Sequence, residues 1–148
     1  MKNRFIVGII LFFILVGTFL YYLRHPLTAK VRIGNHVFPV ELAVTQKEKE
    51  KGLGQRSSLA PGHGMLFVYD HKEVYPFWMK DMQFPLDFVW IAEKTVVDIT
   101  KNVQAPKPGQ PPAVIHPSAP MDKILELNAG DIQRFGTKIG DTVTFPDK

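Results

Sequence analysis

The first residues of the chain contain the feature that most restricts how it can fold. Phe5–Leu23 is a run of 19 residues without a charged side chain. An α-helix of that length rises roughly 28 Å, and the hydrocarbon core of a bilayer is about 30 Å thick. We therefore expect residues 5–23 to form one N-terminal transmembrane helix. Residues 1–24 are then a membrane anchor, and residues 25–148 form a single separate domain.

A cleaved signal peptide is the main alternative for this segment, because Lys2 and Arg4 give it a short basic start. Signal peptides have an apolar region of roughly 7 to 15 residues, followed by small residues at the cleavage site. Here the run is longer and ends in Tyr21, Tyr22 and Leu23, and tyrosines are typical of a membrane interface. These features favour an uncleaved signal-anchor. A lipoprotein is excluded because the chain has no cysteine.

The charges on either side of the run bear on its orientation. A short basic N-terminus before a single apolar segment is typical of a signal-anchor whose N-terminus stays in the cytoplasm. Arg24, Lys30 and Arg32 follow the run, so the charge bias is small. We predict a single-pass protein of the bacterial cytoplasmic membrane, which contacts the bilayer through residues 5–23 and has its C-terminal domain exported.

Charge and composition exclude several classes of protein. The chain has 18 basic and 14 acidic residues, and three of the basic ones lie within residues 1–24, so the remaining domain has a net charge near +1. This balance excludes a basic nucleic-acid-binding module, and we expect no nucleic acid as a partner. With 45% hydrophobic residues the chain is not a disordered one. The absence of cysteine excludes a disulfide framework, a thiolate metal site and a cysteine nucleophile.

The pattern after the anchor predicts a β-dominated α+β domain. Short apolar stretches alternate with turn residues, and no amphipathic period is long enough for a helical bundle. Seven or eight short strands with one or two short helices cannot cover both faces of a flat sheet, so we expect an antiparallel sheet curled into a partly closed barrel. The expected strands are 27–33, 36–43, 65–69, 74–79, 86–92, 95–100, 123–127 and 142–145.

Two short helices and one long loop complete the predicted domain. Thr45 and Glu48 have the spacing of a capping box, which predicts a helix from residue 46 to about residue 53. A second helical turn is expected at 131–135. Residues 105–120 contain six of the twelve prolines, and because proline has no N–H donor we predict a long surface loop there.

Asp87 is the acidic residue that most needs an explanation. In the expected strand 86–92 it shares a face with Val89 and Ile91, so a carboxylate there needs a cation, a set of backbone N–H donors or a proton. One interpretation is structural: Asp87 pairs with Lys80 or Arg56, or caps the preceding turn. We expect the side chain to be mostly buried.

The other interpretation is a binding cleft in which Asp87 is the polar group among the side chains of Phe77-Trp78-Met79-Lys80. Aromatic residues in such a cleft could stack a sugar or hold an extended peptide, although aromatic stretches of this kind are more often core. His63, between two glycines, could border the cleft or be an exposed loop residue. The six candidate ligand-binding residues are Trp78, Met79, Lys80, Asp87, Arg56 and His63.

Recognisable catalytic motifs are absent from the sequence. The five histidines lack metal-ligand spacing, the serines lack a nucleophile elbow, and no glycine-rich nucleotide loop is present. We therefore predict no catalytic residue, no metal and no cofactor, and enzymatic activity is disfavoured. The favoured function is a membrane-anchored cell-envelope domain that binds a small ligand or a protein partner. The alternatives are a structural or assembly protein of the envelope, and a hydrolase whose site the sequence does not reveal.

Six short blocks occur in an order that matches a known bacterial family. They are Val40-Glu41-Leu42-Ala43, Gly52-Leu53 with Arg56, His63-Gly64-Met65-Leu66-Phe67, Phe77-Trp78-Met79-Lys80, Pro85-Leu86-Asp87 and Leu125-Glu126-Leu127-Asn128-Ala129-Gly130. Over about residues 30–146 the chain resembles the DUF192 (UPF0127) family. The resemblance implies a compact β-rich domain, often exported or membrane-anchored, whose biochemical role is not established. It supplies no catalytic residues.

Overall fold

The computed structural model describes residues 7–8, 10–17 and 28–145 of the chain, and the first two of these segments are helical. No helix within the described residues is long and apolar enough to cross a membrane. The prediction of a transmembrane helix ahead of the domain is therefore wrong, because the described helix is shorter than a bilayer span. The rest of the segment 5–23 lies outside the described residues. The division at residue 24 and the export of the domain stay predictions.

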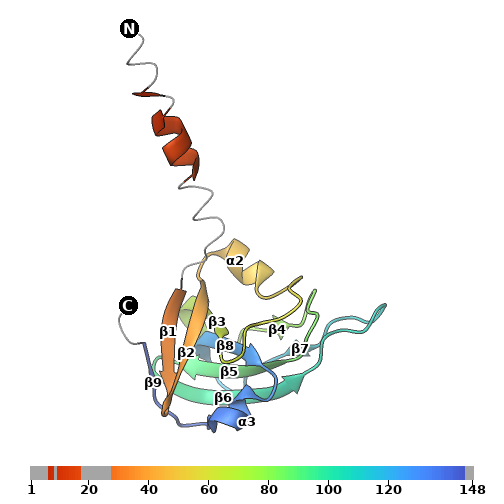
Figure 1. Cartoon of the computed structure of the whole chain (residues 1–148). Coiled ribbons are helices and arrows are strands. Elements are labelled where there is room, and N and C mark those ends of the chain that lie inside the picture. The colour runs from red at the N-terminus through yellow and green to blue at the C-terminus, as the bar shows by residue number, and fades with distance from the viewer. Residues whose placement is uncertain (1–6, 9, 18–27, 146–148) are drawn as a thin grey trace.

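One curled, seven-stranded sheet makes up most of the domain (Figure 1). A smaller sheet pairs β4 (Phe77–Trp78) with β7 (Val114–Ile115). The described domain has two short helices, α2 (Gln46–Lys51) and α3 (Asp131–Phe135), which lie at opposite ends of it. The strands of the large sheet are, in spatial order, β6 (Thr95–Val103), β5 (Leu86–Ala92), β8 (Met121–Asn128), β3 (Gly64–Glu73), β2 (His36–Ala43), β1 (Thr28–Ile33) and β9 (Val143–Thr144).

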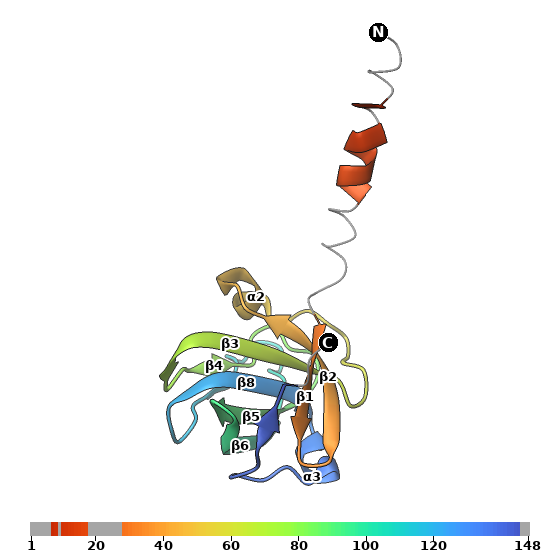
Figure 2. The same ribbon diagram turned by 90° about the vertical axis from the view of Figure 1, so that its left-hand side faces the viewer.

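The large sheet bends into a half-barrel (Figure 2). The C-terminal segment connects its two edges. Val143 pairs with Ile33 of β1, and its N–H donates to the Lys94 carbonyl, 2.8 Å away, in the turn before β6. The N–H of Gly140 donates to the carbonyl of Val96 at 2.8 Å. The prediction of a β-dominated, curled sheet with short helices is confirmed.

The pairing of the strands corrects the expected all-antiparallel sheet. β2 and β3 are parallel, with Val40 opposite Gly64. Residues 44–63, which include α2, return the chain to the end at which β2 began, as a parallel connection requires. The expected strand 74–79 is shortened to β4, because Pro76 cannot donate to a ladder. The predicted loop 105–120 contains β7, whose two residues carry the N–H groups that the surrounding prolines lack.

Strand β5, residues 64–67 of β3 and residues 124–127 of β8 are buried on both faces. Side chains of β5 alternate between two hydrophobic clusters: Phe88 and Trp90 lie in one, Val89 and Ile91 in the other. The cluster containing Phe88 is covered by the β4–β7 sheet, since the ring of Phe77 packs against several aromatic rings there. A polar side chain in these buried stretches therefore enters an apolar layer, whichever face it occupies.

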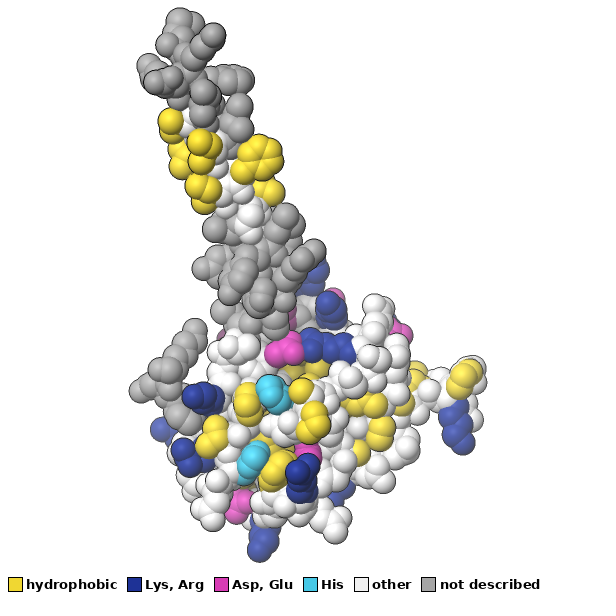
Figure 3. Space-filling view, viewed as in Figure 1, with side chains coloured by type: hydrophobic (Ala, Val, Ile, Leu, Met, Phe, Trp, Pro, Cys, Tyr) yellow, Lys and Arg dark blue, Asp and Glu magenta, His cyan; other side chains and the backbone are white. Residues whose placement is uncertain are grey.

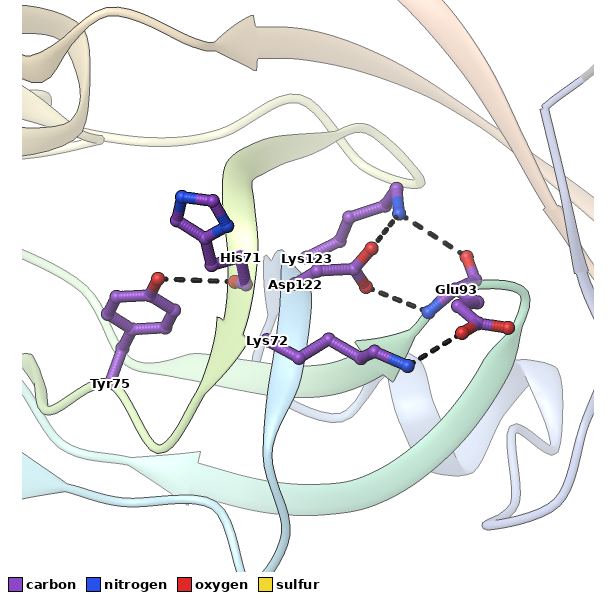
Figure 4. Close-up of polar contacts among 6 residues, drawn as sticks. All are labelled: His71, Lys72, Tyr75, Glu93, Asp122 and Lys123. Atoms are coloured by element: carbon purple, nitrogen blue, oxygen red, sulfur yellow. Dashed lines mark hydrogen bonds and ion pairs between the residues drawn. The ribbon is translucent and has the colours of Figure 1, made fainter.

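Charged side chains hold the turn between β5 and β6 in place (Figure 4). The N–H of Glu93 donates to Asp122 Oδ1 at 2.8 Å. Lys72 Nζ lies 2.6 Å from Glu93 Oε1, and Lys123 Nζ lies 2.7 Å from Asp122 Oδ2. Such pairs contribute little stability in water. These four charged residues are partners of one another, and their contacts hold the turn between β5 and β6.

Candidate functional site

A pocket of about 360 Å³ opens between α2 and the outer face of the large sheet. Helix α2 supplies Lys49 and Lys51 to its rim, and β4 supplies Trp78. Strand β3 contributes Tyr69, and β8 contributes Glu126. The volume is within the range of small-ligand sites, about 300 to 1,000 Å³. Three separate stretches of the sequence, which contain α2, β3 with β4, and β8, thus form one concave surface.

Aromatic side chains form one wall of the pocket. The rings of Tyr69 and Tyr75 stack with their centroids 4.0 Å apart. The Tyr75 hydroxyl donates to the carbonyl of His71 at 3.2 Å, which fixes that ring (Figure 4). Burial raises the pKa of Tyr69 to about 12, so its hydroxyl stays protonated. Trp78 is 52% exposed, so much of its side chain is open to a bound molecule.

Glu126 is the buried polar group of the pocket. It stands on β8 between Met65 of β3 and Phe88 of β5, and only 3% of the residue is exposed. Its Oε2 atom is buried without a hydrogen-bond partner among the described residues. Burial raises the pKa of Glu126 to about 8, and the charge of Arg56 opposes the shift. At neutral pH the carboxyl group is therefore protonated, with one O–H donor and one free acceptor oxygen.

An unpartnered buried carboxyl group is costly, and folded proteins rarely keep one without a use. The sequence analysis did not select Glu126, although the signal was present. Glu126 lies between Leu125 and Leu127 in the expected strand 123–127, the same pattern that drew attention to Asp87. The sequence did not tell which of the two acids would find partners.

Two lysine side chains lie against the aromatic wall. Lys49 Nζ is 4.4 Å from the centroid of the Tyr69 ring, and Lys80 Nζ is 5.5 Å from the Trp78 ring. These distances are within the range of cation–π contacts, which hold an ammonium group near a ring without neutralising it. The structure thus brings together two of the predicted site residues, Trp78 and Lys80, at the rim of the pocket.

Met79 and Asp87 do not line this pocket. Met79 is fully buried in the hydrophobic cluster beneath it. Asp87 is also fully buried, and it accepts hydrogen bonds from the N–H groups of Asn102 (2.8 Å), Gly130 (2.9 Å) and Ile132 (3.0 Å). The predicted burial of Asp87 with backbone donors is confirmed. The expected pairing with Lys80 or Arg56, or a cap on the preceding turn, is not found among the described residues. The three backbone donors instead make the role of Asp87 structural, since they tie α3 and β6 to β5.

Arg56 and His63 lie at other positions. Arg56 forms a double ion pair with Glu41, with Nη1 2.6 Å from Oε1 and Nη2 2.7 Å from Oε2. His63 is exposed and lines a second cavity of about 500 Å³, together with Glu41. Arg56 acts on the first pocket only through its charge, which bears on Glu126. Within the part of the chain that the structure describes, no cluster of His, Cys, Asp and Glu could hold a metal ion.

Comparison with known proteins gives a family and two solved relatives. The DUF192 family, described as an uncharacterized ACR, matches residues 29–145. A "putative transcription regulator" from Sinorhizobium meliloti 1021 is 36% identical with a TM-score of 0.73, over 81% of this chain and 95% of that one. A protein of unknown function from Novosphingobium aromaticivorans DSM 12444 is 32% identical with a TM-score of 0.72, over 81% of this chain and 89% of that one. No curated protein matches. The chain belongs to the DUF192 family.

Proposed function

We propose that the domain is a binding module that takes a small ligand, a sugar or a short peptide, in the pocket between α2 and β4. The observation that carries this proposal is Glu126, a buried carboxyl group that lines an open pocket and has a free acceptor atom. A ligand that hydrogen-bonds to this group would supply the partner that the domain does not. The half-exposed Trp78 beside it offers a flat apolar surface for the same ligand.

Catalysis is a weaker candidate for the same pocket. A hydrolase needs a nucleophile, or an acid and a base whose pKa values are pushed apart. Besides Glu126, the lining contains one carboxylate, Glu50, which is exposed and accepts a hydrogen bond from Gln46 at 2.9 Å. Among the described residues that line the pocket there is no serine, threonine or histidine. One perturbed carboxyl group is sufficient for recognition, whereas hydrolysis requires a second reacting group.

Nucleic-acid binding is not proposed, although one relative is named as a regulator. The net charge of the domain is near +1. On the face shown in Figure 3, Lys and Arg side chains are spread around the domain and do not form one patch. Export of the domain, which is predicted from the sequence alone, would expose the pocket to sugars and peptides of the cell envelope.

A ligand screen on the full-length chain tests the proposal. Thermal unfolding is followed in the presence of mono- and disaccharides and short peptides, and a ligand at a hundred times its Kd should stabilise the protein by about 2.7 kcal/mol. Tryptophan fluorescence then reports the site, because Trp78 is half-exposed whereas Trp90 is fully buried and bonded to Thr100. Binding in the pocket should change the emission of Trp78.

Matched variants separate the pocket from other surfaces. Trp78→Ala should weaken the apparent affinity for the ligand at least about tenfold, because it removes the exposed aromatic wall of the pocket. The ligand-induced thermal shift should be smaller as a result. Ile139→Ala is the control, since Ile139 is also a large exposed apolar side chain, at 59%, and does not line the pocket. A ligand whose binding is equal in both variants would not occupy this pocket. If no sugar or peptide shifts the wild type, the proposal fails.

A further inference from the structure

The lining of the pocket has more positive than negative charge. Lys49 and Lys51 come from the last turn of α2, and Lys80 follows β4. The acidic residues of the lining are Glu50 and Glu126. Because Glu126 is protonated at neutral pH, only Glu50 offsets the three lysines, and the lining has a net charge of two positive. A charged ligand that enters this pocket is attracted if it is an anion.

The ammonium groups of the three lysines form no ion pair among the described residues. The ion pairs of the described residues join Arg56 to Glu41, Lys72 to Glu93 and Lys123 to Asp122. None involves a lysine of the pocket. Two of the pocket ammonium groups instead lie over aromatic rings of the same pocket. Their hydrogen-bond donors therefore remain available to a ligand.

The neutral carboxyl group and the aromatic wall restrict the chemical class of the ligand further. A protonated carboxyl is both donor and acceptor, and a sugar hydroxyl is the neutral group with the same pair of functions. The apolar C–H face of a sugar ring suits a flat, half-exposed indole such as that of Trp78. A ligand that uses all three features has a ring, hydroxyl groups and a negative charge.

We propose that the pocket selects an acidic sugar, whose carboxylate lies among Lys49, Lys51 and Lys80 while a ring hydroxyl meets Glu126 and the ring face lies on Trp78. This proposal rests on the proposed binding function and adds the charge and class of the ligand. Asp70, Glu73 and Asp81 are exposed carboxylates near the rim, but none of them lines the pocket. They weaken the attraction from a distance and are screened by salt.

Matched pairs of sugars test the selection for charge. D-glucuronate is compared with D-glucose, D-galacturonate with D-galactose, and N-acetylmuramate with N-acetylglucosamine, by titration of the full-length chain with Trp78 fluorescence as the readout. The acidic member of at least one pair should bind about tenfold more tightly or better at low salt, and this preference should shrink as salt is added. Equal affinity within every pair that binds would overturn the acidic-sugar proposal and leave the binding function standing.

Single lysine variants assign the charge to the pocket. Lys49→Gln, Lys51→Gln and Lys80→Gln should each lower the affinity for the acidic sugar several-fold, and should lower the affinity for its neutral partner less. Lys107→Gln is the control, because Lys107 is exposed and does not line the pocket. If the control lowers the preference as much as the pocket variants do, the attraction is a property of the whole surface and the proposal fails. If no sugar of any pair binds to the wild type, the acidic-sugar proposal fails. The proposed binding function fails with it only if the short peptides also do not bind.

Discussion

At the scale of single residues, two buried acids on neighbouring strands have opposite surroundings. Asp87 on β5 receives three backbone N–H donors, whereas Glu126 on β8 lies on the other face of the sheet with a free oxygen. Backbone donors stabilise a carboxylate, and an apolar layer without donors favours the protonated form. The difference in partners makes Asp87 part of the framework and leaves Glu126 available to a ligand.

Removal of the Asp87 carboxylate should therefore destabilise the domain. Asp87→Ala leaves the N–H groups of Asn102, Gly130 and Ile132 without their acceptor, so the free energy of unfolding should fall by about 2 kcal/mol or more. Urea unfolding measures this change. Asp70→Ala, at an exposed position, is the control and should stay within about 0.5 kcal/mol of the wild type. A midpoint that Asp87→Ala does not move would show that these bonds contribute nothing.

At the scale of elements, local sequence signals were sufficient to predict most helices and strands. They were not sufficient to predict how distant strands pair. Thr45 and Glu48 form the capping box expected from their spacing, and α2 follows it. Seven of the eight expected strands recur with bounds changed by at most a few residues, because alternation of apolar residues is a local property, whereas 74–79 is reduced to β4. The parallel pairing of β2 with β3 and the short β4–β7 sheet join residues far apart in the sequence, so no local pattern records them.

The pairing of β3 with β8 depends on one glycine. A Cβ at Gly64 would lie 2.8 Å from the Glu126 carbonyl oxygen and 2.8 Å from Leu125 Cδ1, closer than packed atoms allow. Gly64→Ala should therefore lower the free energy of unfolding by about 1 to 3 kcal/mol, measured in urea. Gly17→Ala is the control, since nothing lies within 4 Å of a Cβ at Gly17. Equal midpoints for the two variants would contradict the close approach of the strands.

At the scale of the whole molecule, the pocket exists only because the fold assembles it. Trp78 and Lys80 could be selected from the sequence, because they are adjacent in an unusual aromatic segment. Lys49, Tyr69 and Glu126 come from three other elements, and only the packing of α2 against the curled sheet places them together. Asp87 was grouped with Trp78 by proximity in the sequence, but the alternation of β5 sends it to the opposite face.

The protonation state of Glu126 is the most direct test of the pocket's chemistry. The ligand-free, full-length chain is labelled at glutamate, and carbon NMR follows the carboxyl resonance of Glu126 as the pH is changed. The resonance is assigned to Glu126 because it is missing from the spectrum of the Glu126→Gln variant. Because burial disfavours the charged form, the proton should be held through neutral pH and released as the pH rises through about 8. A midpoint near the ordinary value of 4.5 would mean that Glu126 is charged and solvated, and it would contradict a neutral carboxyl group awaiting a ligand.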